Sequence, residues 1–201
     1  MSKLTKEEVG LSLVEALENA KESIVEEDFD TAITELVNAI EQAKDYKRYF
    51  AKEYLIAYRQ LCLAFRKKGD IQKAAAKIRK AEDFCRMMIM TTDESTDMEN
   101  ELAVCYVNEG ILFEASGDHE NSAVCYENAF SIFKRNNDIG KMLKLILTMI
   151  LNYHQKGDLK QVQRLFCEAD EILNDNQVLE EYKIILENVK TQLKEEDGCD
   201  Y

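Results

Sequence analysis

The sequence predicts an all-α fold, an α-solenoid of antiparallel helix pairs with about nine helices. The chain of 201 residues contains no proline and only seven glycines. It therefore lacks the turn residues that β-sandwiches and β-barrels place every 8–12 residues or so. Hydrophobic residues make up 46% of the chain, which is too many for a disordered protein. A turn pattern also recurs four times, and internal repeats of this kind are typical of helical solenoids.

Aspartates mark the four recurrent turns. Three turns are Gly-Asp pairs, and the fourth has glutamate in place of glycine: Gly69-Asp70, Gly117-Asp118, Gly157-Asp158 and Glu27-Asp28. Glycine adopts the left-handed conformation that ends one helix, and aspartate caps the next. Matching residue classes stand 4, 8 and 11 positions after each aspartate, on one helical face. They are small or β-branched, then large, then alanine: Ala32, Ala74, Ser122 and Val162; Leu36, Ile78, Tyr126 and Phe166; Ala39, Ala81, Ala129 and Ala169.

This pattern predicts antiparallel helix pairs followed by one last helix that covers the open end of the stack. Thr5 with Glu8 and Thr96 with Glu99 are expected to form capping boxes at two helix starts. We expect one domain over residues 1–195 and a flexible acidic tail over 196–201. The expected helices are 6–26, 30–45, 48–68, 71–90, 98–116, 119–135, 139–156, 159–173 and 177–194.

Charge and cysteine usage narrow the function classes. The formal net charge of −13 disfavours nucleic-acid binding, because an acidic surface repels phosphates. The first residues form no apolar leader, and the longest apolar run is too short for a membrane span. Six cysteines without a CxxC pair indicate reduced thiols and a cytoplasmic protein. No catalytic, metal-binding or nucleotide-binding signature is present, so we expect no enzyme, no cofactor and no metal site.

The repeats resemble the tetratricopeptide repeat family. The best unit runs from Tyr106, Glu109-Gly110 and Phe113 through Gly117-Asp118 to Ser122, Tyr126 and Ala129. The family's closing proline is missing, and the aspartates are 42, 48 and 40 residues apart, which is longer than the usual repeat. The chain is in this respect similar to Pins-type and SNAP-type adaptors and to Rap-type peptide receptors. The resemblance implies a right-handed superhelix whose first helices line a concave groove.

At the family's groove positions, the resemblance implies an apolar strip flanked by basic and amide side chains. These candidate peptide-binding residues are Arg59, Leu63, Arg66, Val107, Asn108, Ile111, Lys144, Leu147 and Leu151. Such a groove suits an extended or helical peptide that carries acidic residues. A carboxylate clamp like that of the chaperone-binding members is disfavoured, because Leu63 and Thr148 stand where that clamp has asparagine and arginine. Some of these side chains could instead contact neighbouring helices or water.

Two further segments have both a functional and a plain interpretation. Residues 66–80 hold seven basic residues and one acid, Asp70. They either dock an acidic partner or membrane, or they form a solvated convex face. The polar loop 91–97 is either a phosphorylation site or a simple helix-capping loop.

The expected function is that of a non-enzymatic adaptor that binds a peptide segment of a partner protein in the groove. Two alternatives stay open. The protein could be a structural subunit of a larger assembly, held by its ends or its convex face. It could also be a receptor for a short signalling peptide, as the Rap-type resemblance implies.

Overall fold

The computed structural model describes residues 4–91, 95–175 and 180–198. Within these ranges the chain forms nine α-helices and one 3-10 helix, with no β-strand. The elements are α1 (Lys6–Val25), α2 (Phe29–Ala43), η1 (Lys44–Tyr46), α3 (Ala51–Lys67), α4 (Ile71–Thr91), α5 (Ser95–Ala115), α6 (His119–Arg135), α7 (Ile139–Gln155), α8 (Leu159–Asp175) and α9 (Glu180–Asp197). The predicted all-α fold of consecutive helix pairs is confirmed.

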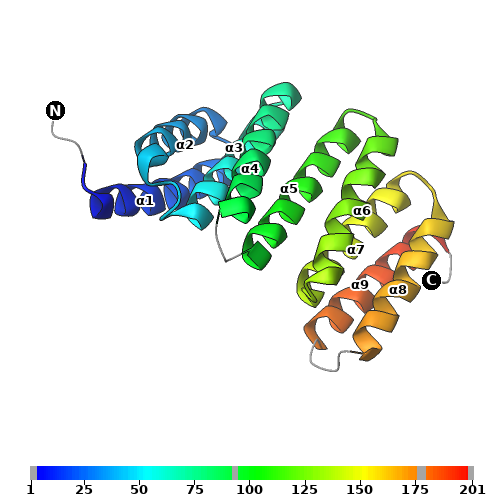
Figure 1. Ribbon diagram of the computed structural model, residues 1–201. Helices are drawn as coiled ribbons and strands as arrows, with labels where there is room; N and C mark the ends of the chain where they lie inside the picture. The colour runs from blue at the N-terminus through cyan, green and yellow to red at the C-terminus, as the bar shows by residue number, and fades with distance from the viewer. Residues whose placement is uncertain (1–3, 92–94, 176–179, 199–201) are drawn as a thin grey trace. The chain divides into compact units, whose positions relative to one another are not determined.

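Two compact units divide the chain, Met1–Ala129 and Phe130–Tyr201, with the boundary inside α6. In the N-terminal unit each helix from α1 to α5 packs on the next one, as Figure 1 shows. Contacts between α1 and α3 and between α3 and α5 place these odd-numbered helices in one layer. In the C-terminal unit α7 packs on α8, and α8 contacts α9. The single domain expected over residues 1–195 stays a prediction.

The expected turn chemistry is present at the recurrent turns. Gly69, Gly117 and Gly157 have φ angles of 85°, 79° and 73°, in the left-handed region that glycine tolerates best. Each following aspartate accepts a hydrogen bond from a backbone N–H three residues later. These bonds run to Asp70 from Lys73 (3.1 Å), to Asp118 from Asn121 (3.2 Å) and to Asp158 from Gln161 (3.3 Å). Asp28 caps α2 in the same way, and Glu27 takes the left-handed conformation without glycine (φ 63°).

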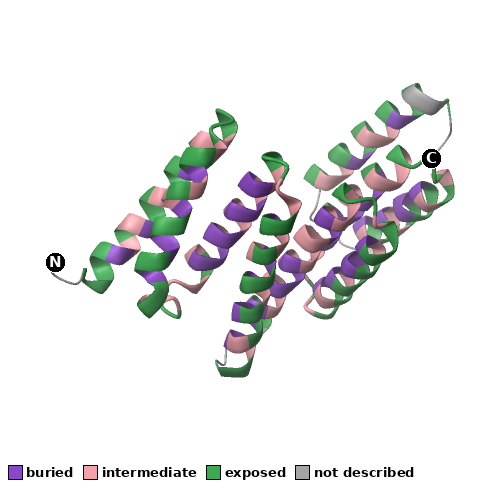
Figure 2. Cartoon of the chain, turned by 90° about the horizontal axis from the view of Figure 1, so that it is seen from above, coloured by how far each residue is buried: buried purple, intermediate pink, exposed green. Residues whose placement is uncertain are grey.

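The residues 4, 8 and 11 positions after these four aspartates are all buried. Figure 2 shows buried positions running along the helices, in stripes that alternate with exposed ones. Gly110 lets α5 approach α6 closely, because an added Cβ would lie 2.5 Å from the ring of Tyr126. Tyr126 is itself only 2% exposed. The repeat pattern therefore marks the surfaces along which the helices pack.

Several helix boundaries differ from those expected. The Thr5–Glu8 capping box is present, but the one expected at Thr96 is wrong, because α5 already includes Ser95. In place of the expected helix 30–45, α2 ends at Ala43 and the chain continues as the 3-10 helix η1. Helix α3 begins at Ala51 instead of residue 48. Helix α9 continues to Asp197 and ends at Gly198, whose N–H bonds to Lys194 O at 2.8 Å. The first residues of the expected flexible tail are thus helical, and residues 199–201 lie outside the described part.

None of the helices in the described ranges combines the length and hydrophobicity that crossing a membrane requires. The described residues also contain no group of three or more His, Cys, Asp or Glu side chains arranged to hold a metal ion.

Candidate functional site

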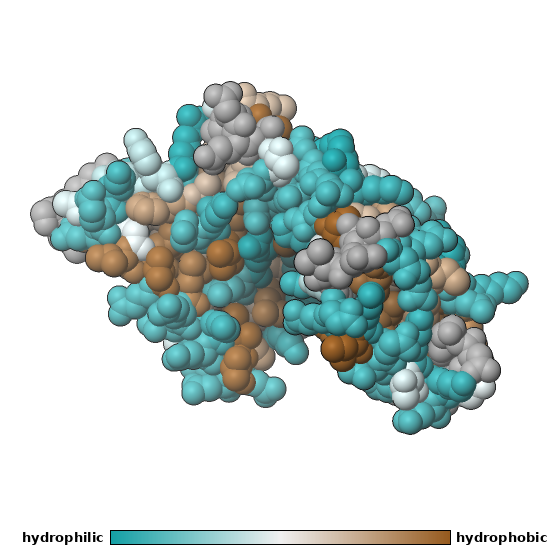
Figure 3. Space-filling model, turned by 90° about the horizontal axis from the view of Figure 1, so that it is seen from below, coloured by the Kyte–Doolittle hydropathy of each residue, from teal (hydrophilic) through white to brown (hydrophobic). Residues whose placement is uncertain are grey.

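Six of the nine predicted peptide-binding residues lie on the odd-helix layer of the N-terminal unit. Arg59, Leu63 and Arg66 are spaced along one face of α3, and all three are half-buried. Val107, Asn108 and Ile111 are also half-buried and share a face of the neighbouring α5. The face of the molecule drawn in Figure 3 shows hydrophobic side chains gathered over the N-terminal unit among hydrophilic ones. We call the six residues the odd-helix face.

Arg59 is engaged inside the protein. Its guanidinium forms an ion pair with the carboxylate of Glu101 on α5, and the two side chains are 23% and 19% exposed. A second ion pair joins α3 to α5, with Lys52 Nζ 2.9 Å from Asp97 Oδ2. Since charged hydrogen bonds with limited exposure hold their partners firmly, Arg59 positions α3 against α5. Arg66, the other cation of the odd-helix face, forms no ion pair with any of the described residues.

Asn108 is partly turned onto its own helix. Its side-chain amide donates a hydrogen bond to Val104 O, one turn earlier, at 2.8 Å. The remaining N–H and the carbonyl oxygen are left for other partners, since the amide group has two donors and one acceptor oxygen. Asn108 therefore uses one N–H within its own helix and keeps its other amide groups available on the odd-helix face.

The other three predicted residues lie on α7, in the C-terminal unit. Lys144 is exposed, Leu147 is half-buried, and Leu151 is 47% exposed. Their spacing places them on one face of the helix. The α7 face therefore offers apolar surface beside a lysine, and the peptide-binding role of these residues stays a prediction.

Neighbouring polar groups fix α3 in its layer. Gln60 Nε2 donates a hydrogen bond to Leu17 O on α1 at 3.2 Å.

Burial raises the pKa of the Cys62 thiol to about 11, although nearby Arg66 partly opposes that shift. A thiol of this kind stays protonated at neutral pH and is a poor nucleophile.

A half-buried carboxyl pair between α4 and α5, Glu82 and Glu109, is a feature that the repeat pattern does not indicate. Burial, with the adjacent Glu109 carboxylate, raises the pKa of Glu82 to about 7, and Arg86 partly opposes the shift. The Cys125 thiol of α6 lies 3.6 Å from Glu109 Oε2, and its pKa is raised to about 12, mainly by burial. Glu82 directly follows the buried Ala81 of the repeat pattern. This neighbouring position is the only feature of the sequence that could have indicated the carboxyl pair.

No family model matches the sequence, and a search of curated proteins finds no relative. Among solved structures, the crystal structure of BtubC (BKLC) from P. vanneervenii is similar, with a TM-score of 0.66. The sequences are 17% identical over 84% of this chain, and the match spans 65% of the BtubC chain. At this identity the likeness concerns the fold alone. It supports an all-α, helical-repeat-like architecture.

Proposed function

We propose that the protein is a non-enzymatic adaptor whose odd-helix face binds a peptide segment of a partner protein. The observation that carries this proposal is the strip of half-buried apolar side chains on adjacent helices, Leu63 on α3 with Val107 and Ile111 on α5. Apolar side chains that keep part of their surface in water gain free energy in proportion to the area that a bound partner covers.

The charge pattern supports a peptide with acidic residues. Arg66 flanks the apolar strip, whereas the charge of Arg59 is balanced by Glu101. One unbalanced cation beside an apolar strip suits a segment with apolar anchors and at least one carboxylate. The resemblance to the tetratricopeptide repeat family supports the same assignment, since its members bind peptides on their first helices.

The proposal is tested by affinity purification with quantitative mass spectrometry, comparing the wild type with a Leu63→Glu/Ile111→Glu variant. Two carboxylates in the apolar strip are expected to lower partner recovery at least about tenfold. The matched control is Val124→Glu, at a half-exposed valine on α6, and it is expected to retain the partner. Circular dichroism checks that each variant is folded.

Arg59 is avoided as a test position, because its removal would leave Glu101 without its ion-pair partner. If the double variant retains every partner at unchanged affinity, the odd-helix face does not bind them. Loss of partners on truncation of α9 alone would instead favour a structural subunit held by its end.

A further inference from the structure

Positive charge is concentrated in one stretch of this acidic chain. Residues 44–80 contain twelve Lys and Arg but only three Asp and Glu, a formal charge of +9. The other 164 residues therefore carry −22. This stretch forms η1, α3 and the first half of α4, all in the N-terminal unit. An isolated basic region on an acidic protein attracts anionic partners to one place.

The same stretch carries a row of aromatic residues on the face of α3 opposite to the odd-helix face. Tyr54, Tyr58 and Phe65 recur at positions that bring them to one side, about 140° or more from Leu63 at 100° per residue. The ring of Tyr54 packs edge-on against Tyr58 and against Phe84 of α4, each with ring centroids 5.2 Å apart. Phe65 lies beneath Lys73 and Lys77 of α4, and all three α3 rings are largely buried, with less than 10% of each residue exposed.

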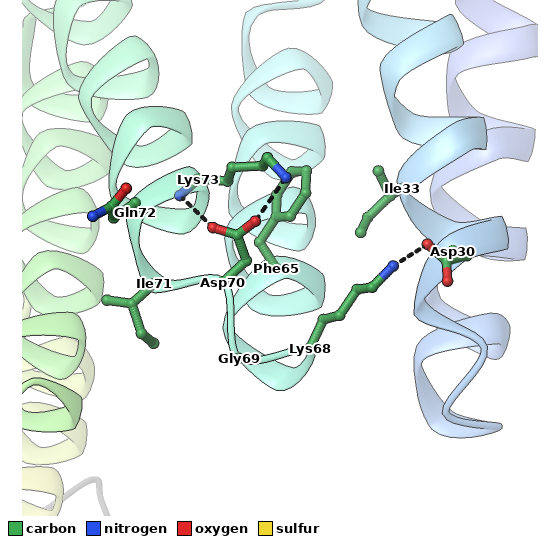
Figure 4. A pocket seen from close by; sticks show the side chains of 9 residues that line it. All are labelled: Asp30, Ile33, Phe65, Lys68, Gly69, Asp70, Ile71, Gln72 and Lys73. Atoms are coloured by element: carbon green, nitrogen blue, oxygen red, sulfur yellow. Dashed lines mark hydrogen bonds and ion pairs between the residues drawn. The ribbon is translucent and has the colours of Figure 1, made fainter.

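A cavity opens at each end of this aromatic row. One, of about 700 Å³, lies between α2 and the α3–α4 turn. Figure 4 shows Asp30 and Ile33 reaching into it from α2, opposite Phe65 and Lys73. The other, of about 240 Å³, is lined by Lys47, Tyr54, Tyr58, Lys80 and Phe84, among others. Phe65 and Tyr54 are eleven residues apart on α3, which is about 16 Å at 1.5 Å per residue.

Three lysines are held over the rings of this strip, and among the described residues one of them forms an ion pair. Lys73 and Lys77 place their Nζ atoms 5.7 Å from the centre of the Phe65 ring, and Lys47 lies 5.6 Å from that of Phe84. Lys73 also pairs with Asp70, but in the described part of the chain Lys47, Lys77 and Lys80 form no ion pair. Burial lowers the pKa of Lys77, and the charges of Lys80 and Lys73 lower it further. A bound anion would relieve this repulsion.

We propose that this surface, the lysine–aromatic strip, binds an acidic segment of a partner protein through two apolar side chains. One anchor enters each cavity, and carboxylates between them pair with Lys77, Lys80 and Lys47. Anchors about 16 Å apart are about five residues apart in an extended chain. The strip lies on the opposite side of α3 from the odd-helix face, so the inference stands independently of the proposed function.

The surface fits a peptide better than a membrane or a nucleic acid. The recesses are lined by rings and aliphatic stems, which suit single apolar side chains. Asp30 and Asp70 line the larger cavity already paired with lysines, and Asp83 lines the smaller cavity with no ion pair in the described residues. A uniform polyanion would compete for the paired lysines and crowd Asp83, whereas a peptide can place its carboxylates beside the unpaired lysines alone.

The test uses fluorescence anisotropy with the full chain and a fluorescein-labelled peptide of about twelve residues, in which two leucines flank four glutamates. This places the leucines five positions apart, to match the two cavities. Wild-type protein is expected to bind with a dissociation constant in the micromolar range, and Lys77→Ala/Lys80→Ala is expected to weaken binding at least about tenfold. A peptide with serines in place of the leucines is expected to lose a similar factor.

The matched control is Lys21→Ala/Lys160→Ala, which removes two exposed lysines elsewhere and changes the net charge equally. It is expected to bind like the wild type. An equal loss in both double variants, an unchanged affinity for the serine peptide, or no binding would each overturn the proposal. So would selective Lys77- and Lys80-dependent binding to vesicles containing 30% phosphatidylserine without peptide binding, which would assign the strip to membranes.

Discussion

At the residue scale, the half-buried carboxyl pair of Glu82 and Glu109 makes stability depend on pH. Because the folded protein raises the pKa of Glu82 from its ordinary value near 4.5 to about 7, the folded state binds this proton more tightly than the unfolded chain. The stabilising contribution is therefore complete below about pH 4.5 and is lost as the pH rises towards 7. At pH 8 the charged Glu82 faces the Glu109 carboxylate in a partly buried position, and this contact destabilises the fold.

We expect Glu82→Gln to raise the melting temperature at pH 8 and to change it little at pH 5. Glutamine has no proton to lose and so stays uncharged at pH 8, and the gain is of order 1 kcal/mol after solvent screening, or about 2–4 °C. Thermal melts of both proteins at the two pH values measure it. Glu120→Gln, at an exposed glutamate, is the control and should show no such pH-dependent difference. An equal effect of Glu82→Gln at both pH values would contradict the assignment.

Two helical glycines are expected to respond oppositely to the same substitution. In Gly110→Ala the new Cβ would meet the buried Tyr126 ring at 2.5 Å, and overpacking of this kind costs about 1–3 kcal/mol. In Gly140→Ala the nearest atom, Tyr182 Oη, is 3.5 Å away, so the helix preference of alanine adds up to about 1 kcal/mol. Urea unfolding measures both changes. Equal destabilisation by the two variants would rule out the close α5–α6 packing as the cause.

At the element scale, aspartate caps define where helices begin. Asp138 Oδ1 accepts the backbone N–H of Lys141 at 3.1 Å, and its Oδ2 lies 2.7 Å from Lys141 Nζ. Asn137 before it takes the left-handed conformation, with φ 53°. The turn before α7 thus repeats the arrangement at Glu27-Asp28, although it lies between the regularly spaced aspartates. The cap satisfies a backbone N–H that has no partner within the helix.

Asp138→Ala is expected to lower the free energy of unfolding by about 1 kcal/mol, because the first turn of α7 loses its side-chain acceptor. Asp138→Asn keeps an acceptor oxygen and should lose less. Urea unfolding gives the totals, and hydrogen exchange should show the loss of protection in the first turn of α7. Glu171→Ala, at an exposed site on α8, serves as the control. Equal losses in the alanine and asparagine variants would argue against capping as the cause.

The fold class follows from the sequence because its determinants are local. The left-handed glycines, the capping aspartates and the periodic apolar positions each act within a few residues, so one sequence is enough to read them. The predicted start of α5 at Thr96 is wrong because the local signal there is ambiguous. Serine and threonine stand side by side there, and either can cap a helix or continue one.

The candidate site is only partly readable from the sequence. The positions of Leu63, Val107 and Ile111 on the outer side of their helices follow from helical spacing. The ion pair of Arg59 does not, because Glu101 lies 42 residues away and the match depends on how α3 and α5 are aligned. The Glu82–Glu109 pair likewise depends on the register of α4 against α5. Contacts between helices are thus beyond a pattern that describes single helices.

At the scale of the whole molecule, helix packing determines how reactive each cysteine thiol is. Cys62, Cys85, Cys105 and Cys125 are buried, and Cys167 is exposed. The pKa of Cys105 is raised by a hydrogen bond to Cys85 and by burial. Cysteine reacts as the thiolate, so buried thiols with raised pKa values are doubly protected.

In a Cys199→Ser background, which removes the cysteine outside the described residues, we expect one thiol to react rapidly with Ellman's reagent and four to react only on unfolding. The rapid thiol is Cys167, so adding Cys167→Ser should abolish the fast phase. Absorbance at neutral pH with and without guanidinium chloride measures both phases. A fast phase that survives in the double variant would show that one of the four buried sites opens readily.

The packing of α1 to α5 has a consequence for how this region acquires its structure. In the described part, each substantially packed helix pair consists of immediate or next neighbours along the chain. Short sequence separations mean low contact order, and chains of this kind fold in about microseconds to milliseconds. Folding can start at any helix hairpin and spread to its neighbours. Growth by duplication of a helix pair would then require compatibility only with the adjoining pairs, so a scaffold of this design can change length without redesign of its core.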